Sequence, residues 1–533
     1  PSGKGFPEVK HNNPRTWDKE DYIMVVQHNM QAMNANRMLN VTTSAQSKST
    51  EKLSSGYKIN RAADDAAGLT ISEKMRKQIR GLDQASTNAQ DGVSSVQTAE
   101  GALTEVHSML QRMNELATQA ANGTNSKDSD RQAIQDEIDQ LTTEIDRVSE
   151  TTKFNETYLL KGEAGTKTIN MKAHDAGLKG TLTDNGDGTA TFVMDSLKDG
   201  DSVSIGGKTY KIGSKLDDAK NLIKAPATGT VDVEIGDQKF KIKSDGEVQN
   251  ANGDKLYVKT ADGSAAAATF TAGTSTFTTS ATFMNNAQTP TATANNALSV
   301  QNLQALVKGG VTVKVGNDTA IAMTDTAGGA ADGVDDNDAT LITRQKAYEL
   351  AGKELLAANS IGDTENHVAV TNGNGDALAF DKGDGSFKIN VGQAKVANSL
   401  AFSLHVGADA DMTNKIQVNI DAMDSASLGI KGLNIKDDSG NAATYAVDAI
   451  SDAISKVSSQ RSSLGAVQNR LEHTINNLDN VVENTTTAES RIRDTDMAKE
   501  MVNYSKNNIL AQAGQSMLAQ ANQSNQGVLS LLQ

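Results

Sequence analysis

The two ends of the chain share one residue pattern, and the middle follows another. Residues 24–160 and 449–533 have the periodicity of long amphipathic helices with few aromatic side chains, and no proline occurs from Met24 to Ala225. Proline breaks a helix interior, so this stretch can hold very long helices. The middle is rich in glycine and threonine and has the two-residue period of strands. Helical ends around a β-rich middle predict a rod that doubles back on itself and buries its seams against copies of itself.

Apolar residues in the N-terminal half recur every three or four positions, which is the spacing of one helix face. One stripe comprises Leu103, Val106, Leu110, Met113, Leu116 and Ala120. A second stripe comprises Ile134, Ile138, Leu141, Ile145 and Val148. Asn122-Gly123 and the polar residues 124–129 form a short connection between them, so the two helices are predicted to be antiparallel neighbours.

The C-terminal end carries a matching stripe with a heptad component. Leu464, Leu471 and Leu478 fall one heptad apart, which is the period of a coiled-coil seam. The stripe also includes Ile450, Ile454, Val457, Val467, Ile475 and Val482. Arg461 occupies a seam position in this register, where it would set the registration of the helices or reach a surface.

The outermost segments, 24–60 and 497–533, are more polar than these seams. Their apolar residues include Leu53, Ile59, Met501, Ile509, Leu518, Leu529 and Leu532. Isolated helices are marginal in water, and this apolar area is too small to stabilise them alone. We expect both segments to be disordered in a monomer and to fold on assembly, where the apolar end at 528–533 would be covered.

The first 23 residues do not share the helical pattern. Three of the five prolines lie here, together with the single tryptophan, Trp17. The codons for Lys19-Glu20-Asp21 could spell a purine-rich ribosome-binding site, which would place the natural start at Met24. The alternative is a tag or a genuine disordered arm. Residues 1–23 are therefore expected to be a non-native or disordered leader.

Residues 162–402 contain an internal repeat of a hairpin-like unit. The copies are Val203, Ile205, Tyr210 and Ile212, then Val233, Ile235, Phe240 and Ile242, and a looser one from Val313 and Val315. Gly206, Gly236 and Gly316 stand at the corresponding turns, and 185–188 and 384–385 are further turn signals. The Thr/Ser/Ala-rich segment 266–283 is interpreted as an exposed strand, with a glycan-bearing segment as the alternative.

The amino-acid composition argues against several classes of protein. The formal charge of −15 argues against a nucleic-acid partner, because phosphate binding needs clustered Lys and Arg. The absence of cysteine excludes disulfides and thiolate metal sites. No run reaches the roughly 20 apolar residues of a membrane span. No signal-peptide pattern is visible, so export is expected to use a route without a cleaved signal.

No motif indicates a catalytic, cofactor or metal site. Asp332, Asp335, Asp336 and Asp338 resemble a calcium loop, but no glutamate follows at the EF-hand spacing, and a solvated turn is the better interpretation. His473 is not in a His-Glu-x-x-His zinc motif, and no serine stands in a Gly-x-Ser-x-Gly elbow. The chain is predicted to be a structural protein without a cofactor, and not an enzyme.

Both helical ends carry long, specific motifs. On the N-terminal side they are Leu-Ser-Ser-Gly-Tyr-Lys-Ile-Asn at 53–60, Asp-Asp-Ala-Ala-Gly-Leu at 64–69 and Glu-Gly-Ala-Leu at 100–103. On the C-terminal side they include Gln-Asn-Arg-Leu at 468–471 and Ala-Glu-Ser-Arg-Ile-Arg-Asp-Thr-Asp at 488–496. The ends that carry them, less than half of the chain, closely resemble bacterial flagellin.

The resemblance implies an α+β fold in which both chain ends form a long antiparallel coiled-coil-like helical rod, with a β-rich outer domain inserted in the middle. It implies inner-tube helices at 24–66 and 497–533 and rod-domain parts at 67–161 and 403–496. The variable outer domain would be 162–402. Flagellins polymerise into the extracellular filament of the bacterial flagellum, which serves motility.

The resemblance also implies partners. Flagellin subunits travel unfolded through the flagellar type III export channel and polymerise at the distal tip under a cap protein. A cytoplasmic export chaperone holds the C-terminal helix beforehand, and hook-associated junction proteins are further partners. The expected partners are therefore copies of the chain and these flagellar proteins, with neither nucleic acid nor membrane.

Flagellins of this type are recognised by the innate immune receptor Toll-like receptor 5 through the rod domain. The residues that match the recognised pattern are Arg112, Leu116 and Glu137, the first two within Leu110–Arg112 and Glu115–Ala117. In the alternative interpretation, Leu116 is a seam residue and the other two lie on a solvated helix face.

One departure from the family pattern occurs near the base of the insert. The family usually has glycine after Phe-Asn, whereas this chain has Glu156, which puts the local turn in doubt. In compact flagellins, the segment that corresponds to 404–409 comes soon after the Phe-Asn motif. The insertion is therefore placed between Leu160 and Leu404.

Three other functions compete with a filament subunit. A hook–filament junction protein has similar ends, but the match at both termini favours flagellin. A flagellin with an enzymatic insert is disfavoured by the missing catalytic motifs. A secreted coiled-coil adhesin would show sustained charged flanks and an anchor, and neither is present.

Overall fold

The computed structural model describes residues 29–122, 124, 126, 129–259, 270–271, 276–278, 282–284, 290–293, 297–325, 332–378, 383–437 and 439–531. The expected leader at 1–23 and Leu532 lie outside these residues. Within the described residues, no helix is both long and apolar enough to cross a membrane. No group of three or more His, Cys, Asp or Glu side chains there could hold a metal ion.

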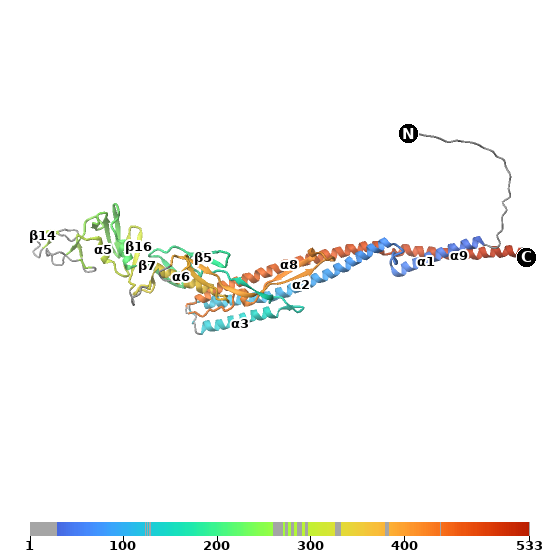
Figure 1. The fold of residues 1–533 in the computed structure, drawn as a ribbon, viewed down its shortest axis with the longest axis horizontal. Helices are drawn as coiled ribbons and strands as arrows, with labels where there is room; N and C mark the ends of the chain where they lie inside the picture. Colours follow the sequence, from blue (N-terminus) through green and yellow to red (C-terminus); the bar gives the residue numbers. More distant parts are fainter. Residues whose placement is uncertain are drawn as a thin grey trace, which may run out of the picture. The chain divides into compact units, whose positions relative to one another are not determined.

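Four long helices come from the two chain ends (Figure 1). They are α1 (Met30–Ser55), α2 (Ala66–Ala120), α8 (Asn441–Arg493) and α9 (Met497–Leu531). The remaining helices are α3 (Asp130–Thr151), α4 (Leu216–Leu222), α5 (Val300–Leu306), α6 (Arg344–Asn359) and α7 (Ser425–Leu428), with a 3-10 turn at Met412–Asn414. The helices predicted from the apolar stripes are therefore present.

The chain divides into two compact units. The first contains the described residues up to Ala89, His405–Lys415 and the chain from His473 onward. The second contains Gln90–Leu404 and Ile416–Glu472. Helices α2 and α8 each contribute to both units. The division of the chain at 66, 161, 402 and 496 into inner-tube, rod and outer domains stays a prediction.

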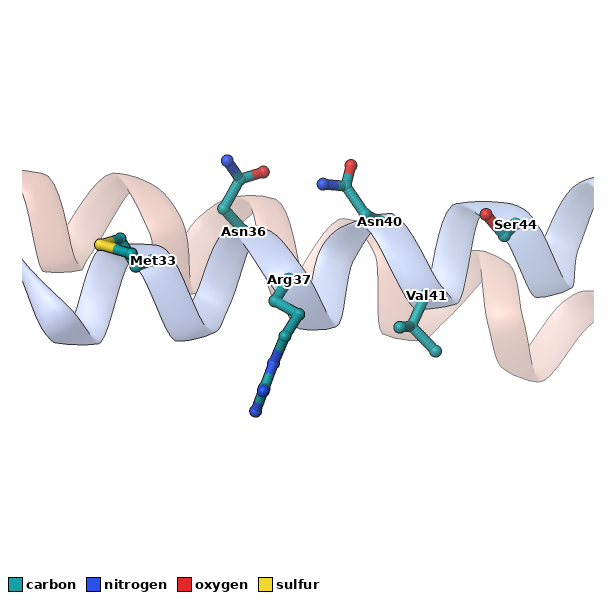
Figure 2. A pocket seen from close by; sticks show the side chains of 6 residues that line it. All are labelled: Met33, Asn36, Arg37, Asn40, Val41 and Ser44. Atoms are coloured by element: carbon teal, nitrogen blue, oxygen red, sulfur yellow. The ribbon is translucent and has the colours of Figure 1, made fainter.

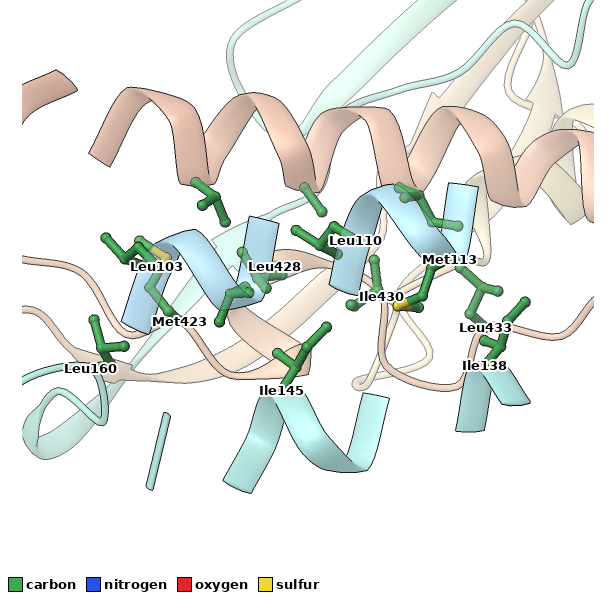
Figure 3. Close-up of a cluster of buried hydrophobic side chains, with 14 of the residues drawn as sticks. Leu103, Leu110, Met113, Ile138, Ile145, Leu160, Met423, Leu428, Ile430 and Leu433 are labelled. Atoms are coloured by element: carbon green, nitrogen blue, oxygen red, sulfur yellow. The ribbon is translucent and has the colours of Figure 1, made fainter. Parts of the chain in front are cut away.

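The helical core of the second unit is a cluster of buried apolar side chains from α2, α3, α8 and the segment 416–435. Figure 3 shows Leu110 and Met113 of α2 and Ile138 and Ile145 of α3 pointing into this cluster, with Leu428 beside them. These residues belong to the two stripes identified in the sequence. A helix pair with a continuous apolar stripe buries that stripe when the helices pack side by side.

Strands are the commonest regular secondary structure in the described middle of the chain. One sheet has the order β10-β9-β8-β15-β16-β7-β17, with β6 also paired to β7, and another has the order β18-β19-β5-β4. The first contains β6 (Ser202–Ile205), β7 (Lys208–Lys215), β8 (Thr230–Ile235), β9 (Gln238–Lys243), β10 (Val248–Gln249), β15 (Thr312–Val315), β16 (Asp318–Met323) and β17 (Leu341–Thr343). The second contains β4 (Gly180–Asp184), β5 (Thr189–Met194), β18 (Ala369–Asn372) and β19 (Ser386–Asn390).

Five two-stranded pairs complete the β-structure. They are β1 (Lys153–Phe154) with β2 (Thr157–Tyr158), β3 (Glu163–Asn170) with β20 (Gln393–Asn398), β11 (Tyr257–Lys259) with β12 (Thr276–Thr278), β13 (Thr282–Met284) with β14 (Pro290–Thr293), and β21 (Leu400–His405) with β22 (Lys415–Ile420). β12 and β13 lie in the segment 266–283, where an exposed strand was predicted. Much of that segment lies outside the described residues.

The three predicted hairpin copies are three real hairpins with one register. Val203 faces Tyr210, Val233 faces Phe240 and Val313 faces Ala320 at the same position of each pair. The loops begin with glycines in the left-handed region, with φ of 57° at Gly206, 58° at Gly236 and 61° at Gly316. Two-residue hairpin loops favour this conformation because it matches the twist of the strands.

The insert begins and ends in one antiparallel ladder. β3 pairs with β20 from Glu163 opposite Asn398 to Asn170 opposite Gln393. Beyond it, β21 pairs with β22, and Leu404 of β21 lies against Gly92 of α2. A Cβ at Gly92 would come within 2.2 Å of the Leu404 side chain, so the flagellin-like glycine permits this close approach.

The aspartate-rich turn differs from the prediction at one residue. Asp335 is buried, and its carboxylate accepts hydrogen bonds from the backbone N–H groups of Thr324, Asn337 and Asp338. The expectation of a solvated turn is therefore wrong for Asp335. A carboxylate that satisfies three backbone donors holds the loop in place, because those N–H groups would otherwise lack partners.

The turn that Glu156 put in doubt does form. Lys153 pairs with Tyr158 and Phe154 with Thr157, so a two-residue loop joins β1 and β2. Its residues Asn155 and Glu156 have φ of 43° and 67°. Asparagine tolerates this left-handed region, whereas glutamate is strained there by about 1–2 kcal/mol. The tight turn therefore forms even though the conformation of Glu156 is strained.

Replacing Glu156 by glycine is expected to stabilise the protein by about 0.5–1 kcal/mol, because the strain at positive φ is removed. The measurement is urea unfolding followed by far-UV circular dichroism. Glu144→Gly inside α3 is the matched control and is expected to destabilise by about 1 kcal/mol. A Glu156→Gly protein that unfolds at lower urea than the parent would contradict the account of the turn.

Candidate assembly interface

Helices α1 and α9 lie side by side within the first unit (Figure 1). The Asn29 side-chain amide donates to the Ala521 carbonyl at 3.1 Å, and Gly514 approaches Leu39 closely. Where side chains are described, the buried ones of the two helices are Ser49 and Ala511. Because few side chains are fully removed from water and the larger ones, such as Leu39, are only half-buried, the contact stabilises the helix pair weakly.

The large apolar side chains of this pair face outward. On α9, Met501, Val502, Ile509, Leu510 and Met517 are between 46% and 67% exposed, and on α1, Met33, Met38 and Val41 are between 58% and 61% exposed. Isolated exposed apolar residues are ordinary, but contiguous apolar patches mark interaction sites. Each helix therefore presents an exposed apolar surface of the kind that marks an interaction site.

Two shallow grooves follow these faces. One runs along α1 and is lined by Met33, Asn36, Arg37, Asn40, Val41 and Ser44. Figure 2 shows Asn36 and Asn40 on one side of the helix and Arg37 and Val41 on the opposite side. The other groove lies on α9 and is lined by Met501, Val502, Ser505, Lys506, Ile509 and Leu510. The α9 groove is the more apolar one, which suits burial against another helix.

The link between α1 and α2 and the link between α8 and α9 are hydrogen-bonded to each other. The Lys58 N–H donates to the Arg493 carbonyl at 2.6 Å, and the Thr495 N–H donates to the Gly56 carbonyl at 2.9 Å. The Arg493 guanidinium lies 4.9 Å from the centroid of the Tyr57 ring, a cation–π distance. The link between α1 and α2 and the link between α8 and α9 therefore form one unit.

The predicted assembly residues fall into three environments. Met501 and Ile509 are exposed on α9, whereas Leu53 on α1 and Leu518 on α9 are half-buried. Leu529 belongs to α9, and its side chain lies outside the described residues, as does all of Leu532.

The prediction that Ile59 lies in the N-terminal inner-tube helix is wrong. Helix α1 ends at Ser55 because Gly56 adopts the left-handed conformation with φ of 76°. Ile59 therefore lies in the link, where its side chain is buried and sits close to Gly68.

The heptad residues of α8 are buried, in agreement with the predicted seam. Leu464, Leu471 and Leu478 are each at most 6% exposed, and Leu464 belongs to the core cluster of the second unit. Arg461 is half-buried, and its guanidinium lies 3.6 Å from a carboxylate oxygen of Glu100 on α2. The seam arginine thus pairs across the two helices, which favours a role in their registration.

The three expected receptor residues do not share one environment. The Arg112 Nε donates to the Glu137 carboxylate at 2.9 Å, and both side chains are about half exposed. The hydrogen bonds that Arg112 donates to Glu137 and then to Glu115 raise the pKa of Arg112. Leu116 is 2% exposed and belongs to the core, as the seam interpretation has it. The solvent-facing part of this region is therefore the ion pair that joins α2 to α3.

Two features of the interface have no strong local sequence signal. Val502 is 67% exposed on α9, and the sequence pattern does not single it out as an assembly residue. The contact of Tyr57 with Arg493 joins residues more than 400 positions apart. The motifs around both residues were visible in the sequence, but their proximity was not.

Family comparisons agree with this architecture at both ends. The model for the bacterial flagellin N-terminal helical region matches residues 26–165, and the model for the C-terminal helical region matches residues 447–532. A flagellin of Clostridium tyrobutyricum is 36% identical over 506 residues, spanning 94% of this chain and all of that protein. The chain belongs to the bacterial flagellin family.

Other flagellins match over similar lengths. A flagellin of Bacillus subtilis (strain 168) is 33% identical over 96% of this chain and 100% of its own length. Flagellin D of Vibrio cholerae (serotype O1, strain N16961) is 32% identical over 95% of this chain and 99% of its own. As a flagellin, the chain is a structural subunit of the flagellar filament, a homopolymer that lies outside the cell.

Placing aspartate at Val502 and Ile509 together is expected to slow filament elongation at least tenfold, because charges would have to be buried with the α9 face. Elongation from short seeds is measured by electron microscopy. Val193→Asp on β5 is the control, since Val193 is also exposed, at 50%, but lies in the middle of the chain. Wild-type elongation by the double variant would contradict the assignment of this face.

Proposed function

We propose that α1 and α9 are the assembly elements of this flagellin and that they order only when neighbouring copies cover them. The support is that large apolar side chains of both helices face solvent, while Ser49 and Ala511 alone are buried among the described side chains of the two helices. A helix pair of this kind gains little from its own contact, and coupled folding and binding is the usual consequence. The exposed apolar face of α9 is the single observation that carries the proposal.

Because α1 and α9 stabilise each other only weakly, the chain is suited to export in an unfolded state. The subunit would pass through a type III export channel without a cleaved signal. A cytoplasmic chaperone would cover the apolar face of α9 until then, because an exposed face of this size promotes aggregation. At the filament tip a cap protein would hold the arriving subunit while α1 and α9 order, and junction proteins would form the boundary to the hook. No catalytic step is part of this function.

Direct growth of filaments tests the central part of the proposal. Purified full-length protein added to short filament seeds is expected to elongate them, with the critical concentration lowered by salts that strengthen apolar burial. A hook–filament junction protein, the alternative, would add to seed ends once and stop. Seeds that acquire no further subunits would therefore count against the filament role.

A second proposal concerns immune recognition. The Arg112–Glu137 ion pair lies on the exposed surface of α2 and α3, where a receptor such as Toll-like receptor 5 could contact it. Planar guanidinium groups bind carboxylates at interfaces in a directional manner, so Arg112 is the stronger candidate. Leu116 would act from beneath by packing α2 against the core, since its side chain does not reach solvent.

Arg112→Ala is expected to weaken binding to the receptor ectodomain about tenfold, because a central interface arginine is lost. Surface plasmon resonance with the monomeric protein measures the affinity. Arg147→Ala is the matched control, since Arg147 is also exposed and pairs with Glu144 on α3. A loss smaller than twofold for Arg112→Ala would remove this residue from the recognised surface.

A further inference from the structure

We infer that an acidic face of α3 in one copy pairs with a basic face of α2 in the next copy and sets the register between subunits. The inference rests on the proposed self-assembly and adds the identity of one contact to it. Both faces are exposed in the chain, and neither is used by the apolar surfaces described above.

The acidic face belongs to α3, where acidic residues outnumber basic residues by seven to two. Asp136, Asp139 and Glu150 fall within an arc of about 60° at 100° per residue, and all three are exposed. Asp136 and Asp139 accept hydrogen bonds from the amides of Gln132 and Gln135, which are neutral donors. Among the described residues no ion pair within 4.0 Å engages either carboxylate, and the Lys436 ammonium beside them donates to the Gln132 amide oxygen at 2.9 Å.

Other charges near this face are already paired. Arg147 lies on the same side of α3, and its Nε donates to Glu144 at 2.8 Å. Asp146 accepts hydrogen bonds from the N–H and hydroxyl of Ser425. These pairs leave Asp136 and Asp139 as the two adjacent carboxylates available to an outside cation.

The basic face lies at the start of α2. Lys74, Lys77 and Arg80 are exposed, and no ion pair within 4.0 Å engages them among the residues that the structure describes. The neighbouring arginines are occupied, since Arg76 pairs with Glu489 at 3.1 Å and Arg493 pairs with Glu73. The three cations therefore remain available, as the carboxylates of α3 do.

The two faces match in spacing as well as in sign. Lys74 and Lys77 are three residues apart on one helix, and so are Asp136 and Asp139 on the other, which separates each pair by about 4.5 Å along its axis. A two-point match between helices fixes their relative translation, which a single ion pair does not. Exposed ion pairs contribute little affinity, so the expected effect is on register and on the rate of encounter.

A second copy of the chain is the partner that this arrangement fits. Every copy carries one acidic and one basic face, and a contact between unlike faces can be repeated without closing on itself. Such a head-to-tail contact generates an open helical polymer. A monomeric partner would need only one of the two faces, whereas a polymer of identical chains uses both.

A charge-swap experiment tests the pairing in full-length protein. Lys74→Glu with Lys77→Glu, and separately Asp136→Lys with Asp139→Lys, are each expected to slow elongation from seeds at least fivefold at physiological salt. The protein that combines all four substitutions is expected to recover to within about twofold of wild type, because the attraction is restored with reversed polarity. Far-UV circular dichroism verifies that each monomer keeps its helices.

Matched reversals elsewhere control for net charge. Lys239→Glu with Lys241→Glu on β9 and Asp217→Lys with Asp218→Lys on α4 change the charge equally and are expected to leave elongation unchanged. The inference is overturned if the two-site reversals elongate normally, or if the combined protein elongates no faster than the slower of them. Wild-type protein that fails to elongate contradicts the proposed function and the inference with it.

Discussion

The other features of the structure depend on one property of α1 and α9. These helices bury few side chains against each other and expose many large apolar ones to solvent. Ser49 and Ala511 alone are buried among their described side chains, while Val502 and Ile509 are each 67% exposed. Fixing the backbone of one residue costs about 1–2 kcal/mol, and a narrow contact between two helices offsets little of that. Under the function proposed above, the ends of the chain depend on neighbours for their stability, whereas α2, α3 and α8 share a buried core of their own.

This division explains why the remaining features lie where they do. Backbone hydrogen bonds and the contact of Arg493 with Tyr57 join the two links, and under the proposed function this connection would let α1 and α9 order together. The β3–β20 ladder brings the ends of the insert together, so a long insertion is tolerated between two pieces of one helical core.

Much of the fold follows from local sequence patterns. The stripes at Leu103–Ala120 and Ile134–Val148 predict two core helices, because a helix face repeats every three to four residues. The hairpin repeat predicts three hairpins, because glycine at the loop and period-two apolar residues act over short distances. Arg461 was recognisable as a seam arginine, although its partner Glu100 was not.

Features that depend on distant contacts could not be predicted in this way. Ile59 has the apolar character of a helix residue, yet Gly56 ends α1 before it and burial in the link determines its place. Asp335 resembles its exposed neighbours in sequence, but one of its backbone donors, Thr324, follows β16 and lies eleven residues away in the chain. Leu116 matches a recognition motif, and its burial follows from packing against α3 and the segment 416–435.

Backbone hydrogen exchange compared between monomers and filaments tests the dependence of the ends on their neighbours most directly. The amides of 30–55 and 497–524 are expected to exchange without measurable protection in the monomer and to be protected at least a hundredfold in the filament. Amides of α2 and α3 around Leu110 and Ile138 are expected to be protected in both states. Strong, equal protection of α1 and α9 in monomer and filament would contradict the account.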